Sequence, residues 1–436
     1  MTGTVAFATL GCRLNQVDTQ EMQARLETRG FRTVPFEEPA DVVVVNSCTV
    51  TARADFSDRQ MVRRAARQHP GARVVVTGCW AQTSPAEAVA TGADLVVGNA
   101  DKHRIDALIA SLVTNADRAT RVAVSDIRTA GAMPVAPLAR TAGRSRAFLK
   151  VQEGCQHRCA FCIVPRARGV SRSQHPEIVV DQVRRLVDAG HPEVVLTGVD
   201  LGHYGADLTP ATTLAALLRR IGDIEGLRWV RLSSVLPAYF TPELVDVVTG
   251  APRIAPHLHI PLQSGSDRVL RRMRRPYTVR RYRAIVERLA TRIPDLGLGT
   301  DLIVGFPGES DGDFADTMRV VDELPFSYLH VFAYSDRRET EAAAMPDHLA
   351  ARTVTRRSAV LRARSDDKAR AFRAALVDRS VEALVLETRD RATGGLIALT
   401  GHYVEIVFDG PDSLMRRLVH LRVTAAGDER ARGELE

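Results

Sequence analysis

The stretch EGCQHRCAFCIVPRARG, residues 153–169, gathers three of the six cysteines of the 436-residue chain. Cys155, Cys159 and Cys162 follow the spacing C-x3-C-x2-C. Clustered thiolates suit zinc or an iron–sulfur cluster, and a closed zinc site needs a fourth ligand. His157 lies in the loop, but it is poorly placed to share a tetrahedron with all three cysteines. Three thiolates instead fit a 4Fe-4S cubane, because they hold three irons and leave the fourth open to a cofactor or substrate.

The sequence around this loop alternates between strand-like and helix-like segments. Six apolar runs have the length and composition of strands, and helix-length segments separate them: 146–152, 192–199, 227–235, 257–265, 298–309 and 328–335. Six βα units predict a partial barrel, in which catalytic groups lie at the carboxyl ends of the strands. The three-cysteine loop follows the first of these strands and is therefore expected on the catalytic face.

The N-terminal part of the chain has its own series of valine-rich runs, at 5–10, 41–47, 73–78 and 94–98. Continuous apolar runs with helical spacers predict a buried parallel sheet in a small doubly wound domain. Cys12, Cys48 and Cys79 each follow one of these runs. Because the carboxyl ends of parallel strands share one edge, we expect the three cysteines to converge there. The alternative is three unrelated buried cysteines.

Composition divides the chain further. Residues 121–145 are rich in Ala, Arg, Thr, Gly and Pro and predict a linker between a domain at 1–120 and a core at 146–375. Residues 376–436 contain short alternating runs broken by glycines, which predict a small antiparallel β-barrel. The predicted fold class is α/β, with a doubly wound parallel N-terminal domain, a partial (βα)6 barrel and a C-terminal β-barrel.

Bulk composition is that of a globular protein, with 45% hydrophobic and 25% charged residues. No apolar run approaches the roughly 20 residues of a membrane span, and the chain does not open on a signal-peptide pattern. We therefore expect a cytoplasmic protein without membrane association and with reduced cysteines, disulfides being the alternative. The net charge of +7 favours a polyanionic partner, although with only three lysines the arginine bias also fits a GC-rich genome.

The whole chain resembles the radical S-adenosylmethionine methylthiotransferases. The resemblance covers, in order, an N-terminal domain with three cysteines, a radical core and a C-terminal barrel like the TRAM domain. The stretches that carry it are TLGCRLNQVDTQ, VVNSCTVT, VTGCWAQ, GCQHRCAFCIVPRARGVSRS, TGVDLGHYG, HLHIPLQSGSDRVLRRMRRPYT and TDLIVGFPGE. Two places depart from the family pattern. Leu236 stands where an acidic residue is expected, which puts one contact to cofactor or substrate in doubt, and residues 334–345 lack an expected Pro and Gly.

The resemblance implies an enzyme that converts a C–H bond into C–S–CH3. It implies two 4Fe-4S clusters, a catalytic one that acts on S-adenosylmethionine and a second that carries the inserted sulfur. Their ligands would be the two cysteine triads, Cys155, Cys159 and Cys162 for the first and Cys12, Cys48 and Cys79 for the second. One S-adenosylmethionine would yield the radical and another the methyl group. Expected partners are an electron donor such as flavodoxin or ferredoxin and a sulfur source that the sequence does not identify. We expect a monomer.

The family divides by substrate. Two branches modify adenosine 37 of tRNA, which carries either an isopentenyl or a threonylcarbamoyl group, and a third modifies an aspartate of a ribosomal protein. The stretches GCRLNQ, HLHIPLQSGSDRVLRRMRRPYT and HVFAYS favour the threonylcarbamoyl branch. We therefore expect methylthiolation at C2 of N6-threonylcarbamoyladenosine 37, with the tRNA anticodon stem-loop as partner. Alternatives are the other two substrates, or a non-catalytic metal-binding protein that binds RNA.

Other candidate site residues rest on weaker signals. Phe161, Gly198 and Gln263 are expected to contact the cofactor, although a strand-end turn at Gly198 and packing at Gln263 are alternatives. Arginines are expected to bind RNA, namely Arg166, Arg168, Arg271, Arg272, Arg274 and Arg275. The alternatives are a solvated helix face for the arginine runs and, for the first two, bracing of the cluster loop. From residue 380 onward the chain has seven Arg against ten Asp and Glu, so composition does not indicate RNA binding by the C-terminal barrel.

Overall fold

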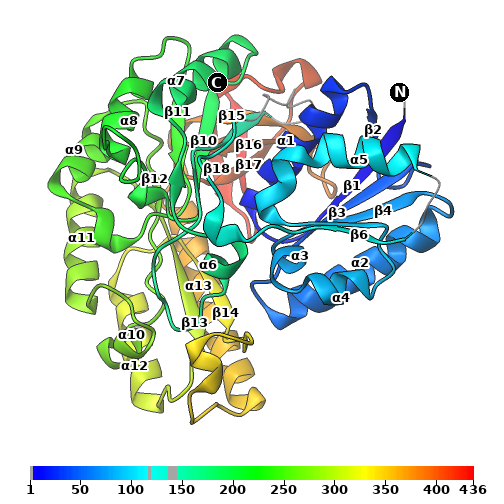
Figure 1. The fold of residues 1–436 in the computed structure, drawn as a ribbon. Coiled ribbons are helices and arrows are strands. Elements are labelled where there is room, and N and C mark those ends of the chain that lie inside the picture. Colours follow the sequence, from blue (N-terminus) through cyan, green and yellow to red (C-terminus); the bar gives the residue numbers. More distant parts are fainter. Residues whose placement is uncertain (1–2, 116–118, 136–144) are drawn as a thin grey trace. The chain divides into compact units, whose positions relative to one another are not determined.

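The computed structural model describes residues 3–115, 119–135 and 145–436. The chain folds into two units (Figure 1). The first comprises Met1–Arg140, Lys150–Gln174 and Ser335–Ala343, and the second comprises Thr141–Leu149, His175–Tyr334 and Ala344–Glu436. The three-cysteine loop therefore belongs to the same unit as the three cysteines of the N-terminal sheet.

The first unit is built on a six-stranded parallel sheet with the order β2-β1-β3-β4-β5-β6. Its strands are β1 (Thr4–Thr9), β2 (Arg32–Val34), β3 (Val42–Ser47), β4 (Arg73–Gly78), β5 (Leu95–Val97) and β6 (Arg121–Ala123). The valine-rich runs form the centre of the sheet, where β3 and β4 are buried along their whole length. Such strands need apolar residues on both faces, which explains why they do not alternate.

Helices cover both faces of this sheet (Figure 1). On one face, α1 (Arg13–Thr28) and α5 (Ile105–Thr114) pack their apolar residues against Val42 and Val44. On the other, α2 (Ala52–Gln68), α3 (Cys79–Thr83) and α4 (Pro85–Val89) pack against Val43 and Val45. The predicted doubly wound topology is confirmed.

The first unit extends beyond residue 120. Strand β6 pairs with β5 although it lies within the predicted linker 121–145, and a short 3-10 helix, η2 (Ile127–Thr129), follows it. Residues 136–144 of the predicted linker fall outside the described residues. The described part of that segment adds a strand and a short helix to the first unit. Three further elements complete this unit around the cluster loop: β8 (Gln152–Glu153), α6 (Val164–Arg168) and β9 (Arg172–Ser173).

The second unit contains the six strands of the predicted partial barrel. They form two three-stranded sheets with the orders β11-β10-β7 and β12-β13-β14, and a bridge between Val230 and Ile254 lies between them. The strands are β7 (Arg146–Lys150), β10 (Glu193–Thr197), β11 (Trp229–Leu232), β12 (His257–His259), β13 (Gly297–Val304) and β14 (Tyr328–Ala333). The intervening helices are α7 (Pro176–Asp188), α8 (Leu214–Gly222), α9 (Pro242–Gly250), α10 (Asp267–Arg272), α11 (Val279–Arg292) and α12 (Asp311–Glu323).

A long helix, α13 (Ala351–Ala374), leads into a closed five-stranded barrel with the order β15-β16-β17-β19-β18. Its strands are β15 (Ser380–Arg389), β16 (Leu396–Thr400), β17 (Glu405–Phe408), β18 (Leu418–Ala426) and β19 (Ala431–Leu435). The predicted antiparallel barrel has one parallel seam, between β17 and β19. An odd number of strands cannot alternate in direction around a closed ring, so one pair has to be parallel. In the described part of the chain, no helix has the length and hydrophobicity to cross a membrane.

Candidate functional site

The three N-terminal cysteines meet at the carboxyl edge of the parallel sheet. Cys12 directly precedes α1, Cys48 follows β3 and Cys79 opens α3, so each lies just beyond a strand end. The loops of Cys12 and Cys48 touch. A Cβ at Gly11 would lie 2.6 Å from Cys48 Cβ and 2.8 Å from its Sγ, which explains the glycine and its φ of +93°. Strand ends that are far apart in sequence thus form one thiol-rich site.

Cys48 is unfavourable as a bare thiolate. Burial raises the pKa of its thiol to about 12, and the neighbouring Cys79 and Cys12 act in the same direction against a backbone hydrogen bond from Val50. Three thiols at one edge, two of them buried, therefore need a positive partner before they can ionise together. A cluster of iron ions supplies such charge and prefers thiolate ligands, so the donor set fits an iron–sulfur group.

The three-cysteine loop is closed at its base by backbone contacts. The Cys155 N–H donates to the Gly169 carbonyl at 3.0 Å, and the adjacent Gly154 has a φ of +75°. A Cβ at Gly154 would lie 1.9 Å from the Val170 carbonyl oxygen, so only glycine allows this approach. Inside the loop, the His157 N–H donates to Cys155 Sγ at 3.4 Å. An N–H directed at sulfur stabilises thiolate character, as a cluster ligand requires.

Arg168 joins the two sets of cysteines. It ends α6, the helix that follows the three-cysteine loop, and its side chain is 2% exposed. Its Nη2 donates to Asn15 Oδ1 at 2.6 Å and Asp18 Oδ2 at 2.9 Å, and its Nη1 donates to Glu153 Oε1 at 2.7 Å. Burial opposes the charge, but Asp18, Cys79, Glu153 and Cys12 together hold the pKa of Arg168 well above its ordinary value.

This burial corrects one expectation. Arg168 has no surface to offer RNA, and the alternative that it braces the cluster loop is the one that its contacts support. Arg166, two residues earlier, is exposed and forms an ion pair with Glu339.

Two asparagines hold the cysteine loops in place, and the sequence reasoning did not single them out. Asn15 Nδ2 donates to the carbonyls of Leu10 and Ser47, which lie just before Cys12 and Cys48. Asn99 Nδ2 donates to the Ala167 carbonyl at 2.7 Å and to Cys79 Sγ at 3.6 Å. Asn15 lies within the stretch GCRLNQ, and its position shortly after Cys12 was a signal in the sequence that it belongs to the site. No comparable signal in the sequence marks Asn99.

A buried ion network extends from Arg168 and was also missed. Lys150 Nζ contacts Asp18 Oδ1 at 2.7 Å and Glu21 Oε2 at 2.8 Å, and Lys102 Nζ contacts Asp18 Oδ2 at 2.8 Å. Although burial favours the neutral acid, Lys102, Lys150 and Arg168 hold the pKa of Asp18 well below its ordinary value. The network fixes α1 against the base of the cluster loop. Two of the three lysines of the chain are committed to it.

Residues 335–343, within the stretch whose composition departs from the family pattern, pack on the cluster loop. The Ala342 N–H donates to the carbonyl of Ala160, between two of the cysteines, at 2.8 Å. Arg337 Nη2 donates to Asp55 Oδ2 at 2.6 Å and to Thr49 Oγ1 at 2.7 Å. The departure from the pattern therefore lies in a segment that supports the loop. Phe161 is half-buried within the same loop.

The second unit carries the other cofactor candidates. Gln263 is buried and has a φ of +70°, and its backbone pairs with Asp301 and Ile303 across β13. A non-glycine residue with positive φ marks strain that a rigid framework sustains, often at a functional site. Gly198 follows β10 at a half-buried strand end, and Leu236 directly precedes a 3-10 helix, η4 (Pro237–Tyr239).

The arginine run in and after α10 divides into two kinds. Arg271 and Arg274 are exposed. Arg275 lies 5.1 Å over the ring of Tyr277 and donates to its hydroxyl at 2.9 Å. Arg272 is half-buried with its guanidinium beside Gly308. Of these four arginines, Arg271 and Arg274 have the exposure that contact with a polyanion needs.

Known proteins show the same combination of parts. The Radical SAM superfamily profile matches residues 149–321, and the profile of Uncharacterized protein family UPF0004 matches residues 4–98. The chain is 39% identical over 428 residues to the threonylcarbamoyladenosine tRNA methylthiotransferase MtaB of Bacillus subtilis, covering 97% of this chain and 94% of that one. The chain belongs to the radical S-adenosylmethionine methylthiotransferases. It is therefore an enzyme that transfers a methylthio group and uses 4Fe-4S clusters with S-adenosylmethionine.

Other members of this family are similar over comparable lengths. MtaB of Aquifex aeolicus is 39% identical over 93% of this chain and 97% of its own. A tRNA-2-methylthio-N(6)-dimethylallyladenosine synthase of Moorella thermoacetica is 34% identical over 99% and 98%. Among solved structures, the radical S-adenosylmethionine methyltransferase TsrM from Kitasatospora setae shares the fold, with a TM-score of 0.58, 16% identity and coverage of 79% of this chain and 74% of that one.

Proposed function

We propose that this methylthiotransferase modifies C2 of N6-threonylcarbamoyladenosine at position 37 of tRNA. The observation that carries the reaction is structural: α6, which follows the C-x3-C-x2-C loop, is bound through Arg168 and Asn99 to the sheet edge that bears the other three cysteines. The choice of substrate is supported by the two MtaB relatives, which are both 39% identical along nearly their whole length.

The two triads take different roles in this proposal. Cys155, Cys159 and Cys162 bind the cluster that activates S-adenosylmethionine, and Cys12, Cys48 and Cys79 bind the second cluster. When bound, the two groups supply a radical that removes hydrogen and the sulfur that replaces it. The protein's own contribution is positional. Asn15 and Asn99 fix the loops of the N-terminal cysteines, Arg168 supplies a buried positive charge beside them, and the Asp18 network keeps α1 and the cluster loop in register.

Phe161, Gly198 and Gln263 are the residues that we assign to the rest of S-adenosylmethionine. Gln263 is best supported, because its backbone has a strained conformation beyond the end of β12 and is held there by hydrogen bonds to β13. Arg271 and Arg274, with Arg166, are the arginines that we assign to phosphates of the anticodon stem-loop, whereas Arg272 and Arg275 are less available. We assign the catalytic core to residues 146–375 and the C-terminal barrel to residues 376–436, as the sequence predicts. The N-terminal domain comprises the predicted residues 1–120 and continues through β6.

We also place the enzyme in the cytoplasm, as a monomer that receives electrons from a flavodoxin or ferredoxin. Cytoplasmic tRNA and reducing conditions for six cysteines support this placement.

Nucleoside mass spectrometry of total tRNA tests the function. A strain without the gene should lose the methylthio form of threonylcarbamoyladenosine and accumulate its precursor, and the intact gene should restore it. A gene carrying Cys159→Ala should not. If the dimethylallyl form loses its methylthio group instead, the other tRNA branch is correct. If tRNA is unchanged in every strain, the tRNA assignment fails and ribosomal proteins become the substrate to examine.

A further inference from the structure

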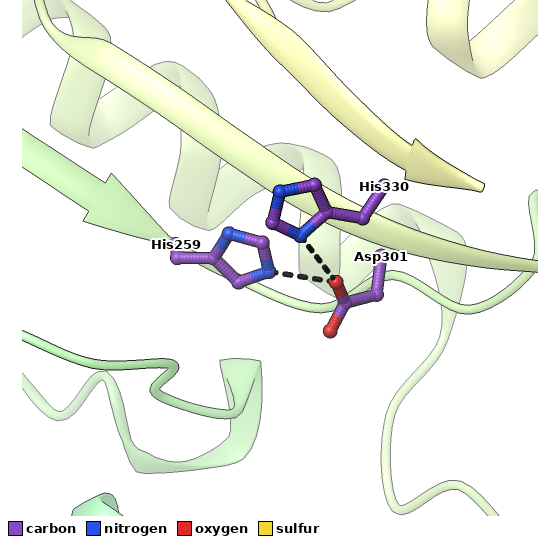
Figure 2. A group of neighbouring side chains, drawn as sticks. All are labelled: His259, Asp301 and His330. Carbon is purple, nitrogen blue, oxygen red and sulfur yellow. Dashed lines mark hydrogen bonds and ion pairs between the residues drawn. The ribbon is translucent and has the colours of Figure 1, made fainter. Parts of the chain in front are cut away.

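Three side chains, none of them from a cysteine triad, converge within the second unit (Figure 2). His259, Asp301 and His330 come from the neighbouring strands β12, β13 and β14, and one ligand atom of each lies within 4.8 Å of the others. His259 Nε2 is 2.9 Å from Asp301 Oδ1, and His330 Nδ1 is 3.3 Å from the same oxygen. No residue of this group is a candidate of the sequence analysis, and the proposed reaction leaves them without a role.

These distances are those of ligands around one metal ion. Two N or O ligands that lie about 2.1 Å from an ion and 90–110° apart are about 3.0–3.4 Å from each other. Two imidazoles and one carboxylate form a set that suits zinc and divalent iron, with positions left open for water. The chemistry of the three ligands and the two distances to Asp301 therefore match a three-ligand site.

The sheet supports the three ligands from behind. Asp301 and His330 are direct partners in the parallel pairing of β13 with β14, so their spacing is set by the backbone ladder. His259 Nδ1 lies 3.1 Å from the Tyr328 hydroxyl, which turns the other ring nitrogen toward Asp301. Metal-binding histidines commonly have such a partner on the second nitrogen. Gly299 makes room for it, because a Cβ there would lie 2.1 Å from the Tyr328 ring.

The group is accessible from one side. His259 is buried, with a side chain 8% exposed, whereas the side chain of His330 is 53% exposed. His330 and Tyr328 line a cavity of about 260 Å³ between β14, α13 and the C-terminal barrel, all within the second unit. An ion can thus reach the three side chains from the side of this cavity.

We propose that His259, Asp301 and His330 form a mononuclear site for a divalent transition-metal ion, distinct from both iron–sulfur clusters. Its role is structural, since it ties β12, β13 and β14 together through side chains. The competing arrangement uses hydrogen bonds alone, with both imidazoles donating to Asp301. The proposal does not depend on the substrate or on the assignment of the cysteines.

Zinc serves as the probe, added to the full-length enzyme with both clusters loaded and followed by gel filtration. We expect the wild type to retain about one zinc per chain at this site. His330→Ala and Asp301→Asn should each abolish this retention, with iron and sulfide contents unchanged. Asp301→Asn is nearly isosteric and keeps an oxygen acceptor, and His330→Ala removes a half-exposed ring, so both should fold. His420→Ala, at an exposed histidine of β18, is the matched control and should retain zinc.

Zinc K-edge absorption identifies the ligands. The proposal predicts nitrogen and oxygen neighbours only, at about 2.0–2.2 Å. It is overturned if bound zinc shows sulfur neighbours at about 2.3 Å, if the two variants retain as much zinc as the wild type, or if no form retains zinc. Because the readout is zinc content and coordination, failure of the tRNA assignment would leave this result unaffected.

Discussion

Arg168 and Asp18 form a buried ion pair, with 2.9 Å between Nη2 and Oδ2 and side chains only 2% and 1% exposed. The partners lie 150 positions apart in sequence. One follows the three-cysteine loop and the other belongs to α1, which begins directly after Cys12. The pair therefore fastens the two cysteine sites to each other within one unit, which is what a reaction that uses both of them requires.

The first prediction concerns the stability that this pair provides. Arg168→Met should lower the free energy of unfolding by about 3–5 kcal/mol, because it leaves Asp18 and Glu153 without their buried guanidinium. Arg168→Lys should lower the free energy of unfolding by less, because lysine retains the positive charge although it cannot make all the directed hydrogen bonds of the guanidinium group. Urea denaturation under anaerobic conditions measures both. Arg166→Gln is the control, and its exposed pair should contribute no more than about 1 kcal/mol. Equal losses at the two positions would contradict the bracing role.

The second prediction separates the two clusters. Cys48→Ala should remove about four of about eight irons and leave the cluster of the C-x3-C-x2-C loop intact, and Cys159→Ala should do the reverse. Iron, acid-labile sulfide and electron paramagnetic resonance of the reduced enzyme measure this. Each variant acts as the control for the other. Loss of all iron in both variants would mean that the triads form a single site, contrary to the assignment.

The sequence predicts most strands of both units, because the pattern of apolar residues and the position of each strand end are local features of the sequence. All six barrel strands, four of the six strands of the N-terminal sheet and the meeting of Cys12, Cys48 and Cys79 follow from apolar runs and from the shared edge of parallel strands. Strand β6 was assigned to a linker because three residues without a buried pattern carry no such signal. The parallel seam of β17 with β19 follows from closing an odd ring, which no local pattern reveals.

The supporting charges could not be predicted for a different reason. Lys150 and Asp18 are 132 positions apart, so their pairing is fixed only by the tertiary fold. The sequence showed Arg168 as one basic residue among many, and charge alone favours the surface. Its burial depends on three hydrogen-bond acceptors that come from α1 and β8. Because the sequence does not show that these acceptors surround Arg168, the expectation that it binds RNA was wrong.

The third prediction concerns the hydrogen bond to Cys79. Asn99→Ala should shift the midpoint potential of the N-terminal cluster to more negative values, by tens of millivolts, because an N–H donor at sulfur favours the more negatively charged reduced state. The titration is done in a chain that also carries Cys155→Ala, Cys159→Ala and Cys162→Ala, so that one cluster contributes. Gln82→Ala is a control, as its amide donates to the Ser125 carbonyl instead. An unchanged or more positive potential would show that Asn99 does not act on the cluster.

The fourth prediction concerns pH and His402, in the turn between β16 and β17. Burial, with a smaller contribution from Arg231, lowers the pKa of this histidine from 6.5, so the folded state holds it neutral. Below pH 6.5 the unfolded chain binds a proton at His402 that the folded chain does not bind. The contribution of the neutral His402 to the free energy of unfolding should therefore be fully present above pH 6.5 and decrease as the pH falls below it. His402→Gln should reduce this loss. Thermal unfolding between pH 5 and pH 8 measures it, with His420→Gln as an exposed control. A variant that loses stability below pH 6.5 as steeply as the wild type would exclude His402 as the cause.

The fifth prediction tests which arginines meet tRNA. Arg271→Gln combined with Arg274→Gln should weaken binding of an anticodon stem-loop and reduce the slope of log K against log salt by about 0.7–0.9 for each phosphate that the variant no longer neutralises. Arg275→Gln should leave that slope nearly unchanged and lower the melting temperature instead, because its guanidinium stacks on Tyr277. Filter binding across a salt series and thermal unfolding measure the two quantities. If Arg275→Gln changes the salt slope as much as the double variant, exposure is not what selects the RNA contacts among these arginines. If neither does, the anticodon stem-loop binds elsewhere, and Arg166 becomes the remaining exposed candidate of the set.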